Sequence, residues 1–299
     1  MAVSLRGIVK RYGALTAVDG VDLDVEPGIV LGLLGPNGAG KSTTMRMLTA
    51  QSRADAGTIH VLGHPVPARS KQARARMGVV QQHDNLDEEL TVRENLAVFA
   101  HLYRVPRRDR AAAVARGLEL ARLTDRRDTR VGKLSGGMRR RLLIARGLVH
   151  EPRLVLLDEP TVGLDPQIRQ ELWLLITRLR SEGVTVLMST HYIEEAERLS
   201  DEVALMARGR VVERGVPGEL IARHAGSTVE EFPQPPAQIQ ELEHLLHGQG
   251  FTTRRTGADL SVMSAEHLPD SLRDRLGRGK PRASTLEDVF VTLTGERIE

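Results

Sequence analysis

The chain has 299 residues, of which 40% are hydrophobic and 27% charged, with a formal net charge of +3. This composition is typical of a globular protein with one large core and a small additional domain. The absence of cysteine excludes disulfides and thiolate metal sites. No apolar run approaches the roughly 18 residues that cross a bilayer. The N-terminus lacks a signal-peptide pattern, so we expect the chain to stay in the cytoplasm.

The first third of the chain predicts strands, a glycine loop and a helix. Residues 2–34 alternate apolar and polar positions between turns, which is the pattern of a half-exposed antiparallel sheet. A buried strand is expected at 29–34, followed by a glycine loop and a helix over 41–49. Further strands are expected at 57–62 and 77–81.

The middle of the chain changes to a helical pattern. Thr91 and Glu94 form the sequence of a capping box in front of an amphipathic helix. Further helices are expected over 111–123 and 138–150, with a loop over 129–137 between them. Strands then return at 154–157 and 184–189, around a helix over 167–182, and a hairpin follows at 203–214.

These elements predict an α/β core with a mostly parallel sheet, interrupted by a helical insertion. We expect a main domain over residues 1–225, with the helical subdomain at about 84–148. The remaining segment, 226–299, is expected to open with a proline-rich linker at 232–236. Its helix, two short strands and two further helices would form a small α+β appendage.

The most specific motif is a glycine loop that matches GxxxxGK[ST]. Its residues are Gly35, Pro36, Asn37, Gly38, Ala39, Gly40, Lys41 and Ser42. Glycines let the backbone wrap a phosphate chain, and the following helix N-terminus adds positive potential. We expect Lys41 to reach the β- and γ-phosphates of a nucleotide, Ser42 to bind Mg²⁺, and Thr43 to contact the α- and β-phosphates.

A second motif supplies the other half of a nucleotide site. Residues 154–159 read LVLLDE, an apolar strand that ends in two carboxylates. Asp158 is placed to hold Mg²⁺ through water, and Glu159 is placed to polarise an attacking water. The pair is weak evidence alone and strong evidence beside a phosphate loop.

Basic residues are concentrated between residues 104 and 141, where thirteen Arg or Lys stand against four Asp or Glu. Such an excess suits anionic lipid headgroups, an acidic partner surface or nucleic acid. It is equally compatible with a solvated helix face.

The segment 134–138 reads LSGGM and resembles the signature of ABC ATPases, which other P-loop NTPases lack. Other motifs of that family follow in order over residues 2–222. Tyr12 stands where the family's adenine-stacking aromatic lies, and Gln82 where its Q-loop glutamine lies, with Gln81 as the alternative. Asp165 resembles the D-loop aspartate, and His191 the switch histidine.

The signature departs from the family pattern at one position, because it ends in Met138 where Gln is usual. This form resembles ATPases of the daunorubicin-resistance and nodulation exporters. Segments 85–95 and 285–290 also resemble that group. The implied fold is a P-loop NTPase core with an antiparallel β subdomain, a helical insertion and a C-terminal appendage.

The resemblance implies a dimer in which two cassettes sandwich two ATP molecules. Each ATP would contact the P-loop of one subunit and Ser135, Gly136 and Gly137 of the other. We expect a homodimer or a pair with a close relative. In each site Mg²⁺ would be held by Ser42, Asp158 and Gln82.

The resemblance also assigns the catalytic roles. Glu159 would orient water, His191 would contact the γ-phosphate, and Gln82 would couple that phosphate to the helical insertion. The chain would be the ATP-hydrolysing subunit of an exporter of drug-like, lipid or other hydrophobic substrates. It would lie peripherally on the cytoplasmic face of the membrane beneath a separate permease, with no nucleic acid partner.

Two other function classes remain open. One is a soluble ABC protein that acts on ribosomes or DNA, which the single cassette and the ordinary size of the insertion argue against. The other is a non-catalytic ATP-binding scaffold. The segment after residue 226 would support dimerisation or regulation, or simply stabilise the fold.

Overall fold

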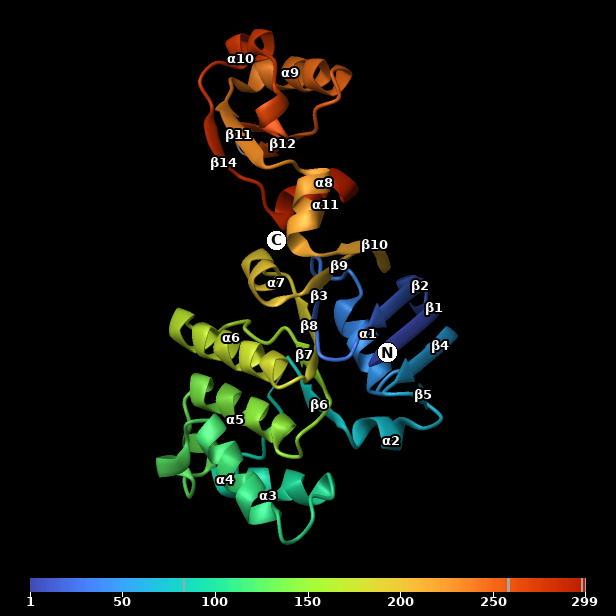
Figure 1. The fold of residues 1–299 in the computed structure, drawn as a ribbon, viewed down its shortest axis with the longest axis vertical. Coiled ribbons are helices and arrows are strands. Elements are labelled where there is room, and N and C mark those ends of the chain that lie inside the picture. Colours follow the sequence, from blue (N-terminus) through green and yellow to red (C-terminus); the bar gives the residue numbers. More distant parts are fainter. Residues whose placement is uncertain (83, 257–258, 297, 299) are drawn as a thin grey trace.

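The computed structural model describes residues 1–82, 84–256, 259–296 and 298. Its elements form an elongated body with a helical insertion at one end, two sheets in the middle and a C-terminal unit at the other end (Figure 1). In the part of the chain that the structure describes, no helix is long and apolar enough to span a membrane.

A six-stranded sheet forms the centre, with strand order β10-β9-β3-β8-β7-β6. Its strands are β3 (Val30–Leu34), β6 (Met77–Val80), β7 (Leu154–Asp158), β8 (Thr185–Thr190), β9 (Glu202–Ala207) and β10 (Arg210–Gly215). All neighbours pair in parallel except β10, which is antiparallel to β9. Every residue of β3 and β8 is buried, as expected for parallel strands covered on both faces. The predicted mostly parallel sheet is therefore confirmed.

The register of this sheet brings three strand ends together. Leu34 of β3 pairs with Thr190 of β8, and Asp158 of β7 pairs with Ser189 of β8. The loops that follow these strands therefore leave the same edge, which is where ligands bind in open α/β sheets.

The predicted antiparallel sheet at the N-terminus is also confirmed. It has the order β2-β1-β4-β5, with β1 (Val3–Tyr12), β2 (Leu15–Val25), β4 (Ala56–Val61) and β5 (His64–Val66). Helix α1 (Lys41–Leu48) follows β3 of the central sheet, and α2 (Ser70–Arg74) follows β5. Met45, Met47 and Leu48 of α1 belong to the hydrophobic cluster that joins the two sheets. The hairpin between β1 and β2 leaves Tyr12 46% exposed.

The helical insertion consists of α3 (Val92–Leu102), α4 (Arg110–Leu120), α5 (Gly136–Leu148) and the short 3-10 turns Thr124–Arg126 and Val131–Lys133. The predicted capping box is present, since Glu94 N donates to Thr91 Oγ1 at 3.2 Å and Thr91 N donates to Glu94 Oε2 at 2.8 Å. The predicted loop over 129–137 was wrong at its end. Ser135 is the N-cap of α5, so Gly136 and Gly137 form its first turn.

Three helices cover the core beyond the insertion: α6 (Pro166–Ser181), α7 (Ile193–Leu199) and α8 (Pro217–His224). Trp173 and Ile176 of α6 pack in the cluster that also contains the helical insertion. Helices α7 and α8 were not predicted, and each spans only about two turns.

The C-terminal unit contains β11 (Thr228–Pro233), α9 (Pro236–Gly248), β12 (Thr253–Thr256), β13 (Asp259–Val262), the 3-10 turn Ala265–His267, α10 (Asp270–Leu276) and β14 (Lys280–Ala283). Its sheet order, β12-β13-β11-β14, and its βαββαβ succession are those of a ferredoxin-like unit. Phe232, Leu260 and Leu272 share a cluster on the helix-covered face. The prediction of two strands missed β11, which lies inside this sheet, and β14, which forms one of its edges.

The proline-rich segment at 232–236 is not a linker, so that prediction was wrong. Phe232 is fully buried, and Gln234 Nε2 donates to the Leu276 carbonyl at 2.5 Å. Pro235 is the N-cap of α9 and Pro236 begins the helix. Proline is tolerated at a strand end and in the first turn of a helix, so its abundance here does not disrupt either element.

The last helix, α11 (Leu286–Thr294), returns to the cassette. Leu286, Val289 and Phe290 are buried with residues of α7, α8 and the central sheet. Leu286 N also donates to Glu197 Oε1 of α7 at 2.6 Å. The end of the predicted segment 226–299 therefore packs on the main domain.

A buried ionic network ties α11 to the ferredoxin-like unit. The Asp288 side chain is 0% exposed, and its two oxygens accept from Arg282 Nη1 and Nη2 at 2.7 and 2.8 Å. Arg282 also bonds Glu231, and Arg254 lies 2.9 Å from Glu287. Although burial raises the pKa of Asp288, the bonds from Arg282 and the Thr285 backbone hold it below its ordinary value.

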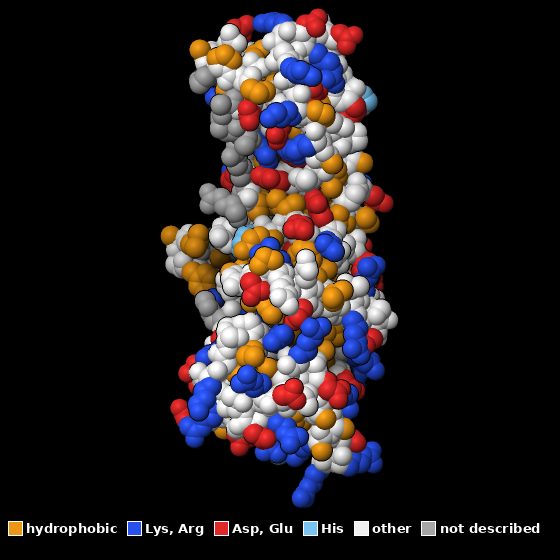
Figure 2. Space-filling model, turned by 90° about the vertical axis from the view of Figure 1, so that its left-hand side faces the viewer, with side chains coloured by type: hydrophobic (Ala, Val, Ile, Leu, Met, Phe, Trp, Pro, Cys, Tyr) orange, Lys and Arg blue, Asp and Glu red, His pale blue; other side chains and the backbone are white. Residues whose placement is uncertain are grey.

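The arginine-rich segment 104–141 finds many of its counter-ions elsewhere in the chain. Ion pairs join Arg116 to Glu151, Arg122 and Arg141 to Glu171, Arg130 to Glu89, and Arg139 to Asp84 and Glu88. Figure 2 shows the basic and acidic side chains interspersed over this end of the molecule. Much of the local charge excess is therefore balanced by carboxylates outside the segment.

Candidate nucleotide site

The phosphate loop lies between β3 and α1, at the edge where the strands of the central sheet end. A Cβ on Gly35 would lie 2.1 Å from the Met206 carbonyl oxygen, so no side chain fits there. Gly40 has a φ of 104°, and a Cβ added there would lie 2.4 Å from the carbonyl oxygen of Ala17. Both glycines are required by close backbone approach, as a phosphate cradle demands.

Lys41 begins α1 with its side chain only 4% exposed. Its Nζ donates to the Gly35 and Pro36 carbonyls at 2.6 and 3.1 Å and lies 3.3 Å from Glu159 Oε1. The ammonium group is therefore held inside the loop that bears the backbone N–H groups. An ammonium group beside clustered backbone N–H groups is suited to phosphate oxygens.

Ser42 and Asp158 approach each other from different elements. Ser42 Oγ donates to Asp158 Oδ1 at 3.0 Å, and Ser189 Oγ donates to the same oxygen at 2.6 Å. A hydroxyl and a carboxylate are hard oxygen ligands suited to Mg²⁺, which usually takes one or two carboxylates and completes its shell with water and phosphate. The described residues contain no cluster of three His, Cys, Asp or Glu, and this partial oxygen set fits a metal that arrives with a nucleotide.

Glu159 occupies a left-handed backbone conformation with a φ of 48°, which is uncommon for a residue other than glycine. Its carboxylate is buried between Lys41 and His191, and His191 Nδ1 lies 2.7 Å from Glu159 Oε2. The Glu159 N–H donates to both the carbonyl and Oγ of Ser189 at 3.1 Å. Glu159 is therefore held directly after the end of β7 by its backbone N–H and by contacts to both carboxylate oxygens.

A hollow of about 240 Å³ opens over these groups. It is lined by Tyr12, Leu15, Ala17, the loop residues Asn37, Gly38, Ala39, Gly40, Lys41, Ser42 and Thr43, and by Gln82 and Glu159. The sequence-predicted residues Tyr12, Gln82 and Glu159 therefore meet at one site. Gln81 does not line this hollow, and its Oε1 accepts from Asn85 at 3.3 Å. This geometry favours Gln82 as the residue that faces the phosphate loop.

The signature residues Ser135, Gly136 and Gly137 do not line this hollow. They lie at the start of α5, where a Cβ on Gly137 would be 3.1 Å from Ile168 Cγ1 of α6. Asp165 caps the same α6, since its Oδ1 accepts from Ile168 N at 2.9 Å. The structure thus groups the signature with Asp165 and leaves both outside the hollow of their own chain.

Three residues near the site were missed by the sequence analysis. Ser189 bonds both Asp158 and the Glu159 backbone, and a polar residue at the end of a buried strand was the available signal. Glu195 is 1% exposed and lies 3.4 Å from Trp173 Nε1; burial raises the pKa of its carboxyl. Arg140 was hidden in a run of arginines that reads as a solvated face.

Comparisons with known proteins identify the family of this chain. A family model described as "ABC transporter" matches residues 18–162. The chain is 44% identical over its full length to Nod factor export ATP-binding protein I of Paraburkholderia xenovorans (strain LB400), of which it covers 98%. The protein of the same name from Rhizobium sp. (strain N33) is also 44% identical, with 99% of that protein covered.

Solved structures lead to the same family. An ATP-binding subunit of an ABC transporter aligns over 76% of this chain and 94% of its own, with a TM-score of 0.70 and 26% identity. A dimeric ATP-binding cassette in a post-hydrolysis state, bound to ADP and Pi, aligns over 72% of this chain and 98% of its own, with a TM-score of 0.65 and 26% identity. The chain therefore belongs to the ABC transporter family, in which it is an ATP-binding subunit with ATPase activity.

Proposed function

We propose that this ATPase drives an exporter, working as a dimer on the cytoplasmic face of a membrane and bound to a separately encoded permease. The observation that carries the catalytic part is the convergence of Lys41, Asp158, Glu159 and His191 at one sheet edge. The names of the relatives support the exporting direction, since they are export ATP-binding proteins.

The dimer is supported by the division of the site residues. Lys41 and Glu159 line the hollow, whereas Ser135 and Gly136 lie on the helical insertion outside it. A two-fold partner could bring its own signature over that hollow, since one chain then supplies both halves of each site. Among the structural relatives, ABC cassettes have been solved as dimers. We propose a homodimer, with a close paralogue as the other possible partner.

The chain's own groups account for hydrolysis. The backbone of Gly38–Lys41 would cradle the phosphates, with Lys41 Nζ on the terminal pair and Tyr12 against the adenine. Glu159 would give up its contact with Lys41 to accept a proton from the attacking water, and His191 would hold the γ-phosphate. Ser42, Asp158 and Gln82 would hold Mg²⁺, which supplies charge stabilisation to the transferring phosphoryl group.

The signature and the coupling residues complete the proposal. Ser135, Gly136, Gly137 and Asp165 would contact the nucleotide of the partner subunit. We propose a drug-like, lipid or other hydrophobic cargo, consistent with an antibiotic-resistance role, and a peripheral position beneath the permease. No nucleic acid partner is proposed.

The catalytic assignment is tested with Glu159→Gln in the full-length chain. Steady-state turnover should fall by at least about a hundredfold, the usual size of a general-base contribution, while binding of a fluorescent ATP analogue is retained. Glu194→Gln is the matched control, because Glu194 is exposed on the nearby α7. Unchanged turnover in Glu159→Gln would remove Glu159 as the base.

The transport assignment is tested by recovery of partners from membranes of the native cell. The tagged Glu159→Gln chain is used as bait, once with ATP and once without it. Recovery of a polytopic membrane protein supports the exporter. Recovery of ribosomes or nucleic acid by a folded, ATP-binding dimer would favour a soluble ABC function.

A further inference from the structure

Arg140 lies on α5, in the helix that begins with the signature. It is only 9% exposed, and among the described residues no carboxylate lies within ion-pair distance of it. Burial lowers the pKa of its guanidinium group, because removing the charged group from water costs free energy. A buried arginine without a paired carboxylate must be stabilised by hydrogen bonds to its N–H groups.

Those bonds all go to backbone carbonyls of two loops at the nucleotide site. Arg140 Nε donates to the Pro160 oxygen at 2.9 Å, and Nη2 donates to the Glu159 oxygen at 3.3 Å. Nη1 donates to the Gln81 and Gln82 oxygens at 2.9 and 3.3 Å. One planar group therefore joins the loop of the proposed base to the loop of the proposed coupling glutamine.

The contact to Glu159 has a specific consequence for that residue. Its left-handed backbone needs external support, and strain of this kind persists only where the surroundings hold it. Ser189 binds the Glu159 N–H, and Arg140 binds the Glu159 carbonyl. Movement of the guanidinium would therefore change the position of the Glu159 carboxylate.

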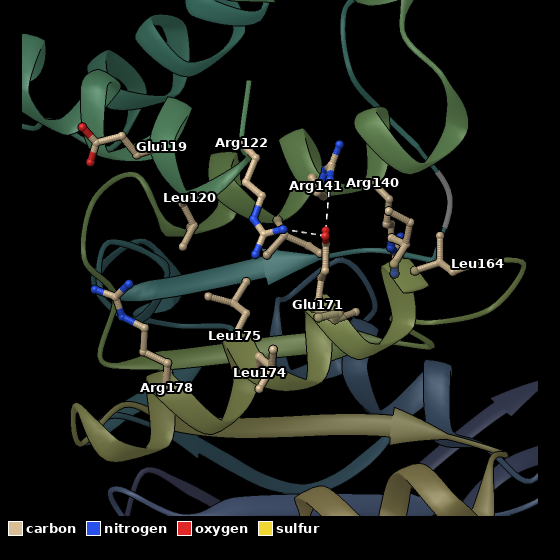
Figure 3. A pocket seen from close by; sticks show the side chains of 13 residues that line it. Glu119, Leu120, Arg122, Arg140, Arg141, Leu164, Glu171, Leu174, Leu175 and Arg178 are labelled. Atoms are coloured by element: carbon tan, nitrogen blue, oxygen red, sulfur yellow. Dashed lines mark hydrogen bonds and ion pairs between the residues drawn. The ribbon is translucent and has the colours of Figure 1, made fainter. Parts of the chain in front are cut away.

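The helix that carries Arg140 is anchored on both sides. Arg139 bonds Asp84 at 2.6 Å, and Arg141 bonds Glu171 of α6 at 3.0 Å. Figure 3 shows Arg141 converging on Glu171 at the pocket between α5 and α6, with Arg140 beside it. Because a helix moves as a rigid unit, a displacement at the signature would be transmitted to Arg140 one turn further along.

We infer that Arg140 is a positioning residue that couples the two ATP sites of the dimer. Engagement of the signature with the partner's ATP would set α5, and Arg140 would then align Gln82 and Glu159 of its own site. Hydrolysis at one site would thereby depend on nucleotide at the other. This inference rests on the proposed ATP-sandwich dimer.

The experiment measures ATPase rate against ATP concentration for the full-length wild type, Arg140→Met and Arg140→Lys. Arg140→Met keeps most of the length of the side chain and removes its N–H donors. Arg140→Lys keeps the positive charge and removes the planar guanidinium group that reaches several carbonyls at once. Arg116→Met is the control, because Arg116 pairs with Glu151 at the surface. We expect Arg140→Met to lower kcat by about tenfold to a hundredfold and to reduce the Hill coefficient to about 1.

In the same variant, binding of a fluorescent ATP analogue should stay within about twofold of the wild type, since Arg140 does not line the hollow. Arg140→Lys should recover part of kcat but not the Hill coefficient. If Arg140→Met fails to fold, Arg140→Lys alone decides the question. A wild-type Hill coefficient in either folded variant would overturn the coupling role.

Two results separate this inference from the proposed function. A wild type that forms an ATP-dependent dimer but hydrolyses with a Hill coefficient of 1 would overturn the coupling and leave the ATPase assignment intact. A Glu159→Gln chain that never dimerises with ATP, measured by light scattering, would overturn the sandwich and the inference together.

Discussion

We expect the stability of the cassette to depend on pH through the buried side chain of His150. Its ring stacks on Tyr103 with 3.8 Å between centroids and an interplanar angle of 10°. Burial lowers the pKa of His150 to about 4, from an ordinary value of 6.5. The folded chain therefore keeps the ring neutral at pH values where the unfolded chain has already bound a proton.

The direction of the pH dependence follows from the proton that only the unfolded chain binds. The stabilisation is fully present above pH 6.5 and is lost as the pH falls from 6.5 towards the folded pKa of about 4. At 1.36 kcal/mol for each pKa unit, the complete loss is about 3 kcal/mol, and about 2 kcal/mol is already lost at pH 5.

The assay compares urea unfolding of the wild type and His150→Phe at pH 7.5 and pH 5, followed by circular dichroism. Phenylalanine retains an aromatic ring against Tyr103 and cannot titrate. The wild type should lose about 2 kcal/mol more stability than the variant between the two pH values. Equal pH dependence in both chains would refute a buried, neutral His150.

Three other substitutions follow from the geometry. Gly35→Ala should abolish ATP binding in a fluorescence titration, because the added Cβ would lie 2.1 Å from a backbone oxygen. The control is Gly218→Ala, which should bind ATP normally because no atom lies within 4 Å of the added Cβ. Asp288→Asn should lower the free energy of unfolding by about 1–3 kcal/mol, since Arg282 loses the charge of one of its two carboxylate partners and keeps Glu231. Thr91→Ala should cost about 1 kcal/mol in thermal unfolding, through loss of the capping box.

The parts of the site that the sequence predicted are those with strict local requirements. A phosphate loop needs glycine where backbone atoms approach closely, and Gly35 and Gly40 meet that need. Asp158 follows directly from a buried strand, so its place at the sheet edge could be inferred. The role of these residues in ATP chemistry stays a proposal, whereas the cassette fold and the ATPase family are established by the comparisons.

The sequence failed where long-range packing decides the outcome. Arg140 is adjacent to Arg139 and Arg141, yet these two pair with carboxylates while Arg140 is buried among carbonyls. Nothing in a run of three arginines distinguishes them. The prolines near residue 235 likewise predicted a linker. The burial of Phe232 could not be inferred from this local composition, because it depends on contacts with strands that follow later in the chain.

The C-terminal unit is connected to the nucleotide site through α7. That helix begins two residues after His191, and its Glu197 accepts the N–H of Leu286 at the start of α11. Two residues further along α11, Asp288 binds Arg282 of the ferredoxin-like sheet. These partly buried contacts form a continuous connection from the ferredoxin-like sheet through α11 to the helix that follows His191.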